Sequence, residues 1–104
     1  MRKRVLVADP DPDVCALLEL AVRRAGHDTV PRDTHAGVDA IVMEPGCPVA
    51  RSILRRFRDA VPPVVCVSIY PREAGYAPPG TIAYLVKPAT PSRLARTLAH
   101  VLAA

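Results

Sequence analysis

Four short apolar runs in this chain each end in a single polar residue. They are residues 5–8 before Asp9, 41–43 before Glu44, 64–67 before Ser68 and 82–86 before Lys87. Runs of this length are typical of strands that are buried on both faces of a parallel sheet. Because ligands and charge chemistry collect outside the carboxyl ends of such strands, the two acids, the hydroxyl and the lysine are predicted to meet at one site.

Length and composition set modest bounds on the fold and on the partners. The 104 residues are predicted to form one domain over 1–104, with no output domain, and the low aromatic content of 4% fits an aliphatic α/β core. The net charge of +4 permits an anionic partner without requiring one. No apolar run is long enough to cross a membrane, and no secretory signal is expected. Three cysteines without metal-type spacing predict reduced thiols in the cytoplasm.

Three stretches have the apolar periodicity of helices. In the first, Asp11 is the expected N-cap and Pro12 the first helical residue, and the helix is predicted to end near Gly26. Its predicted inward stripe is Val14, Leu17, Leu18, Ala21, Val22 and Ala25. A second helix is predicted over 49–60, with the apolar stripe Val49, Ala50, Ile53, Leu54, Phe57 and Val61 opposite Arg51, Arg55, Arg56 and Arg58. A third is predicted after Thr90 as the cap, with inward residues Leu94, Leu98, Val101 and Leu102.

Two connections are too poor in helical signals to contain a full helix. Residues 27–30 are a candidate short strand, and only 31–39 separate them from the next apolar run. A parallel crossover usually needs a dozen or more residues, so 31–39 is predicted to be an extended loop that passes over one intervening strand. Prolines and glycines in 69–81 leave room for one helical turn at most, around residues 72–74.

The order of acid, acid, hydroxyl and Lys-Pro at the four strand ends resembles the receiver domain of two-component response regulators. The resemblance is carried by residues 5–13, 39–44, 63–68 and 84–88, and it covers nearly the whole chain. It implies an α/β, flavodoxin-like fold with a five-stranded parallel sheet in the order 2-1-3-4-5. The family's second helix would be missing here and its fourth reduced.

The resemblance also implies a chemistry, in which a histidine kinase passes a phosphoryl group to an aspartate and magnesium is held by an acidic cluster. Glu44 stands at the position of that aspartate, and Pro10 stands where the second metal-binding acid belongs. Proline has no side-chain oxygen, and Glu44 carries its carboxylate one methylene further, so both departures affect the reaction itself. Asp9, Asp11 and Glu44 remain weak candidates for a metal, although Asp11 is needed as a helix cap.

The residues therefore predict a degenerate phospho-acceptor pocket, with no cofactor and no enzymatic activity. Its members are Asp9, Pro10, Asp11, Glu44, Ser68 and Lys87, with Tyr84 at the position of the family's switch aromatic. Two hypotheses for Glu44 stay open. Its carboxylate either imitates a phosphoaspartate by pairing with Lys87 and Ser68, or it belongs to an ion network that only neutralises charge at the strand ends.

The function predicted is a phosphorylation-independent signalling module that acts through protein contact. With two helices lost, a single helix covers one sheet face, and a partner protein or a second copy is expected to cover the rest. The alternatives are a working phospho-acceptor or metal-dependent enzyme, and a domain that binds a small ligand in the crevice or nucleic acid on its arginine face. Direct nucleic-acid binding is not favoured, because the chain has neither a recognition-helix motif nor aromatic stacking residues.

Overall fold

The computed structural model describes residues 2–103, which form one five-stranded sheet and three α-helices. All neighbouring strands are parallel, in the order β2-β1-β3-β4-β5. The strands are β1 (Arg4–Ala8), β2 (Asp28–Val30), β3 (Ala40–Met43), β4 (Val64–Ser68) and β5 (Thr81–Val86). The helices are α1 (Pro12–Arg24), α2 (Pro48–Arg56) and α3 (Pro91–Val101), with a 3-10 turn, η1 (Arg72–Ala74). The predicted fold class and strand order are therefore confirmed.

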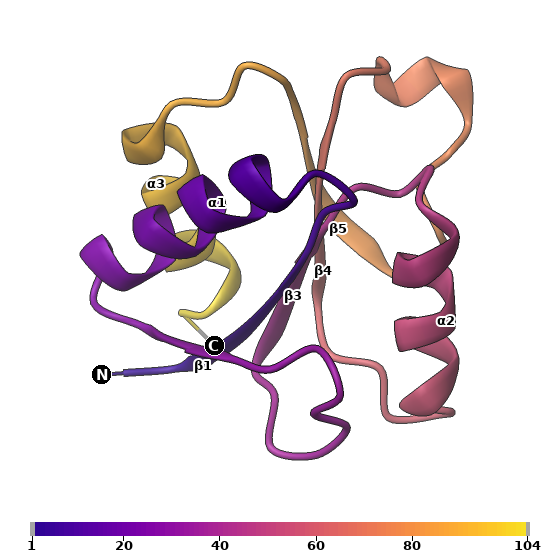
Figure 1. Cartoon of the computed structure of the whole chain (residues 1–104), viewed down its shortest axis with the longest axis horizontal. Helices are drawn as coiled ribbons and strands as arrows, with labels where there is room; N and C mark the ends of the chain where they lie inside the picture. The colour runs from indigo at the N-terminus through magenta and orange to yellow at the C-terminus, as the bar shows by residue number, and fades with distance from the viewer. Residues whose placement is uncertain (1, 104) are drawn as a thin grey trace.

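The helices cover the two faces of the sheet unequally. Helices α1 and α3 lie together on one face, and α2 lies on the other face (Figure 1). We call the first the two-helix face and the second the one-helix face. Alternate residues of the strands point to opposite faces, so the sheet supplies side chains to two separate apolar cores. This division fixes which strand residues each helix must cover.

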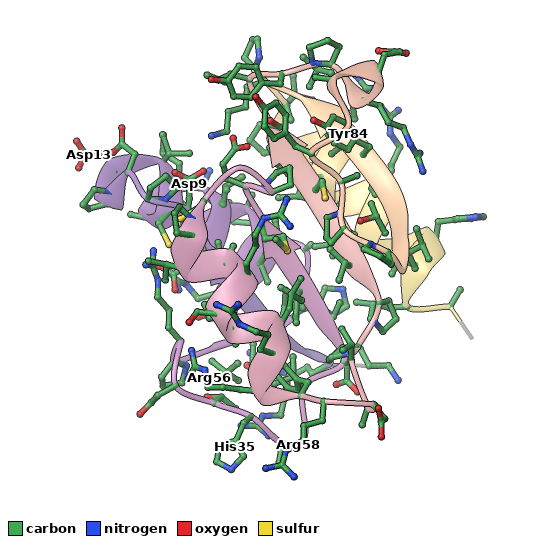
Figure 2. All side chains as sticks on the ribbon, turned by 90° about the vertical axis from the view of Figure 1, so that its right-hand side faces the viewer. Asp9, Asp13, His35, Arg56, Arg58 and Tyr84 are labelled. Carbon is green, nitrogen blue, oxygen red and sulfur yellow. The ribbon has the colours of Figure 1, made fainter. Side chains whose placement is uncertain are left out.

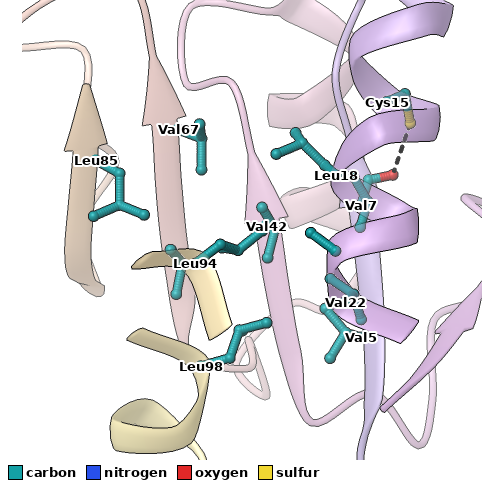
Figure 3. Packing of buried hydrophobic residues seen from close by; sticks show 12 residues of the cluster. Val5, Val7, Cys15, Leu18, Val22, Val42, Val67, Leu85, Leu94 and Leu98 are labelled. Carbon is teal, nitrogen blue, oxygen red and sulfur yellow. Dashed lines mark hydrogen bonds between the residues drawn. The ribbon is translucent and has the colours of Figure 1, made fainter. Parts of the chain in front are cut away.

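The core of the two-helix face is built from valines and leucines (Figure 3). Valines of β1, β3 and β4 point at buried residues of α1 and at Leu94 and Leu98 of α3. Both helices begin with a side-chain cap and a proline. Asp11 accepts from the backbone N–H groups of Asp13 and Val14, and Thr90 caps α3, as predicted.

The core of the one-helix face depends on α2. Ala50 and Ile53 are its buried residues, and Phe57, immediately after the helix, is buried in the same core. The helix is shorter than predicted, because it ends at Arg56 rather than near residue 60. Arg58 adopts a left-handed backbone conformation with φ of 53°, which cannot continue a right-handed helix.

Three residues assigned to inward stripes are in fact exposed. Val61 lies beyond the early end of α2 and is 41% exposed, and Val49 lies in the first turn of that helix, turned towards solvent. In α1, Leu17 is 66% exposed although its neighbour Leu18 is buried. Successive helical residues are about 100° apart, so a stripe that includes both leucines is too wide for one of them to reach the sheet.

The two weak connections have the predicted character. Residues 31–39, all of them described, form turns and bends without a helix, and they carry the chain from β2 across β1 to β3. Between β4 and β5 the only helical element in the described chain is η1. Within residues 2–103, none of the helices has the length and apolar character needed to cross a lipid bilayer.

Candidate functional site at the carboxyl ends of the strands

The sheet brings the four polar strand-end residues together. Asp9 follows β1, Glu44 follows β3, Ser68 ends β4 and Lys87 follows β5. The register pairs Ala8 with Met43, which sets Asp9 beside Glu44 on neighbouring strands. Asp9, Glu44 and Ser68 are buried, and the side chain of Lys87 is 20% exposed. Figure 2 shows Asp9 between the start of α1 and the ends of the strands.

Glu44 is the residue in which these contacts converge. The Ser68 hydroxyl donates to Glu44 Oε1 at 2.7 Å, and the backbone N–H of Gly46 lies 3.4 Å from the same oxygen. The other oxygen, Oε2, lies 3.3 Å from Lys87 Nζ. Both carboxylate oxygens of Glu44 are therefore held by groups of the protein itself, and the buried charge has the partners that burial requires.

Lys87 joins Glu44 to the second buried acid. Its Nζ donates to Asp9 Oδ2 at 2.8 Å. Burial by itself would lower the pKa of Lys87, but the hydrogen bonds and charges of Asp9 and Glu44 outweigh that effect and raise it. The ammonium is thus kept protonated between two carboxylates.

The acidic cluster is engaged in local bonds rather than arranged around a common point. Asp9 Oδ1 accepts from the backbone N–H of Asp11 at 2.9 Å, and Asp11 Oδ1 caps α1. Pro10 has no side-chain donor or acceptor. Among the described residues, no group of three or more His, Cys, Asp or Glu side chains is placed to hold a metal ion. The donor set does not fit magnesium, which requires several oxygens in near-octahedral geometry.

Tyr84 is linked to the site through Tyr70. The backbone N–H of Tyr70 donates to Ser68 Oγ at 3.1 Å, and the Tyr84 hydroxyl donates to the Tyr70 carbonyl at 2.7 Å. Tyr84 is half-buried, and Figure 2 shows it on β5 below the segment that contains η1. A continuous series of hydrogen bonds therefore runs from Glu44 through Ser68 and Tyr70 to Tyr84.

Arg32 is a site residue that the sequence did not indicate. It lies in the loop between β2 and β3, and its guanidinium donates to the Asp9 carbonyl at 2.5 Å and to Cys15 Sγ at 3.3 Å. The bond to Cys15 raises the pKa of Arg32 despite partial burial. An irregular loop has no periodicity that could have assigned this side chain to the strand ends.

Comparisons with solved structures place the fold. A sensor protein from Polaromonas sp. JS666 is 21% identical with a TM-score of 0.79, covering 99% of this chain and 98% of that one. A response regulator receiver protein from Burkholderia phymatum is 22% identical with a TM-score of 0.78, at 98% and 96% coverage. The chain has the receiver-domain fold. No protein-family model and no curated protein sequence matches it.

Among the similar structures is one that was solved with a bound metal. It is the receiver domain of a sensor histidine kinase from Pseudomonas aeruginosa PAO1, solved with magnesium in its active-site cleft. It is 18% identical to this chain with a TM-score of 0.76, and each chain is fully covered. In the present chain a crevice of about 440 Å³ opens at the carboxyl ends of the strands. The crevice is lined largely by apolar residues, among them Pro10, Val14, Pro48 and Ile69.

Proposed function

We propose that this chain is a receiver-type signalling module of the cytoplasm that acts through protein contact and is not phosphorylated at Glu44. The observation that carries the proposal is the full engagement of the Glu44 carboxylate, by Ser68 on one oxygen and Lys87 on the other. Each oxygen that could attack phosphorus is thus already held by a donor of the protein, which lowers its availability as a nucleophile. Magnesium could otherwise assist the attack, but Pro10 has no oxygen ligand in its side chain, and the carboxylates of Asp9 and Asp11 are engaged in local bonds.

Of the two hypotheses for Glu44, the contacts support imitation of a phosphorylated state. The resemblance to receiver domains assigns the hydroxyl and the lysine to the phosphoryl group, and here both contact Glu44. The bonds from Ser68 to Tyr70 and from Tyr70 to Tyr84 continue this arrangement to the surface of the one-helix face. We propose that the domain therefore rests in one fixed signalling state rather than switching between two.

The surface near Tyr84 supports protein contact as the output. Large apolar side chains of β5 and of the segment around η1 remain exposed there, and an apolar patch of this kind is typical of an interaction site. They are Ile69, Tyr70, Tyr76, Ile82 and Val86. A partner protein or a second copy of the chain would bury them.

The proposal is tested by incubation with acetyl phosphate and magnesium, followed by intact-mass spectrometry. We expect no phosphoryl mass on the native chain and a clear addition to the Glu44→Asp, Pro10→Asp double variant, which restores the acceptor and the second acid. The matched control is Glu44→Asn with Pro10→Asp, which has the restored acid but no carboxylate at position 44. Addition of a phosphoryl group to the native chain would overturn the proposal.

A further inference from the structure

One side of α1 carries a stripe of four exposed residues with no role in the crevice. They are Asp13, Leu17, Leu20 and Arg24, spaced four, three and four residues apart, so they lie in one row along the helix. We call them the α1 stripe. Leu17 is 66% and Leu20 38% exposed. Within residues 2–103, the side chains of Asp13 and Arg24 form no ion pair, and Figure 2 shows Asp13 at the outer end of α1.

The α1 stripe borders a hollow that could receive a second helix. A groove of about 300 Å³ lies between α1 and the start of α3, lined by both leucines and Arg24 from α1 and by Ala89 and Pro91 from the other side. An adjoining hollow continues past Leu17 towards Lys87 and Pro88. The lining of the two hollows is mostly apolar. Asp13 and Arg24 stand at opposite ends of the α1 stripe.

We propose that a second copy of this chain docks on the α1 stripe, with its own α1 antiparallel to the first. Under two-fold symmetry about the middle of the stripe, each residue faces its mirror position in the other copy. Asp13 then faces Arg24 of the second copy, and Leu17 faces Leu20. The interface then has four leucines in its centre and an ion pair at each end, and the two-fold axis relates the two ion pairs.

The order of charges identifies the occupant as a second copy. A two-fold interface must be complementary to itself, because the same patch is contributed by both subunits. A stripe with an acid at one end, a base at the other and leucines between them meets this condition in the antiparallel orientation only. In the parallel orientation the acids would face each other and so would the bases, which is repulsive. The contact is small, so the dimer is weak and forms at high concentration.

This dimer is independent of the proposed function in its residues and in its test. It uses the outside of the two-helix face, whereas Glu44 and the apolar patch near Tyr84 lie elsewhere. Sedimentation velocity of the native chain should show a monomer–dimer equilibrium from roughly 10 µM to roughly 1 mM, the range expected for a small interface. The association should weaken as salt screens the ion pairs.

Charge reversal provides the decisive experiment. Asp13→Arg and Arg24→Asp should each raise the dimer dissociation constant about tenfold, because each turns both ion pairs into repulsions. The double variant should regain the native dissociation constant, and a mixture of the two single variants should form a heterodimer. Arg23→Asp is the matched control, because it makes the same change in charge one residue away, where the side chain bonds Thr29 instead.

Three results would overturn the inference. The first is a native chain that stays monomeric over the whole concentration range. The second is a dimer whose response does not follow the proposed charge pairing, either because Arg23→Asp weakens it as strongly as Arg24→Asp or because the double variant does not restore the native dissociation constant. The third is a dimer that survives both single reversals and is dissociated by Ile82→Lys, which would place the second copy on the one-helix face.

Discussion

The two faces of the sheet are completed in different ways. On the two-helix face, α1 and α3 cover the strands, and the exposed apolar residues Leu17 and Leu20 lie on the outside of a helix. On the one-helix face, α2 is the one α-helix of the described chain that covers the strands, and Ile82 and Val86 of the edge strand itself are exposed. The first face is covered by helices, so its exposed surface is a helix surface, whereas the second face leaves part of the sheet itself exposed.

The difference shows that the sheet forms without equal helix cover on its two faces. Strand order and register depend on the buried runs, which are intact on both sides. The cover on the one-helix face depends on connections, and residues 31–39 and the segment around η1 are too short or too rich in proline to form helices. The two faces therefore differ in helix cover at the surface and not in the buried strand residues.

The largest effect is expected from truncating the buried core on each face. Ile53→Ala in α2 and Leu98→Ala in α3 remove fully buried side chains, and each should lower the free energy of unfolding by about 2–5 kcal/mol. Because no second α-helix lies beside α2 within residues 2–103, Ile53→Ala should also speed hydrogen exchange in α2 selectively, through local opening. Urea titration and hydrogen exchange followed by NMR measure the two quantities. Uniform acceleration across all elements in Ile53→Ala would contradict the independence of α2.

A smaller effect should separate covered strand positions from uncovered ones. Val67→Thr places a hydroxyl in the buried core of the two-helix face and should cost about 1–3 kcal/mol of unfolding free energy. Ile82→Thr makes a similar change at a position that is 54% exposed, and should cost about 0.5 kcal/mol. Urea titrations of the two variants give the comparison. A loss of unfolding free energy at Ile82 equal to that at Val67 would show that the exposed strand residues of the one-helix face are covered in solution.

The features that could be predicted from the sequence are those fixed by short-range chemistry. The buried runs specify the strands, and parallel strands bring Asp9, Glu44, Ser68 and Lys87 to one edge because each acid, hydroxyl or amine directly follows its run. The helix starts were equally accessible, since a capping side chain followed by proline has a local physical meaning. These signals need no knowledge of distant contacts.

The remaining features depend on the tertiary arrangement. Arg32 reaches Asp9 and Cys15 only because the loop after β2 passes the strand ends, and its own neighbours in sequence do not indicate this. Helix α2 ends at Arg56 because Arg58 adopts a left-handed conformation next to the buried Phe57. The prolines further along the chain do not indicate this early end. Leu17 belongs to an apolar pattern wider than the surface available to bury it.

The smallest effect is the pH dependence that Lys87 gives to stability; this residue lines both the crevice at the strand ends and the hollow beside Leu17. Its pKa is raised by Asp9 and Glu44 against the opposing effect of burial, so the folded state binds this proton more tightly than the unfolded state does. The stabilisation is therefore complete below the unfolded pKa of about 10.4 and is lost as the pH rises through the higher folded value. Above that pH, the midpoint temperature of thermal unfolding should fall more steeply with pH for the native chain than for Lys87→Met. The variant should be less stable at neutral pH because it leaves two buried carboxylates unpaired, so only the slopes are compared. Because the two proteins differ only at position 87, parallel slopes would show that folding does not raise the pKa of Lys87.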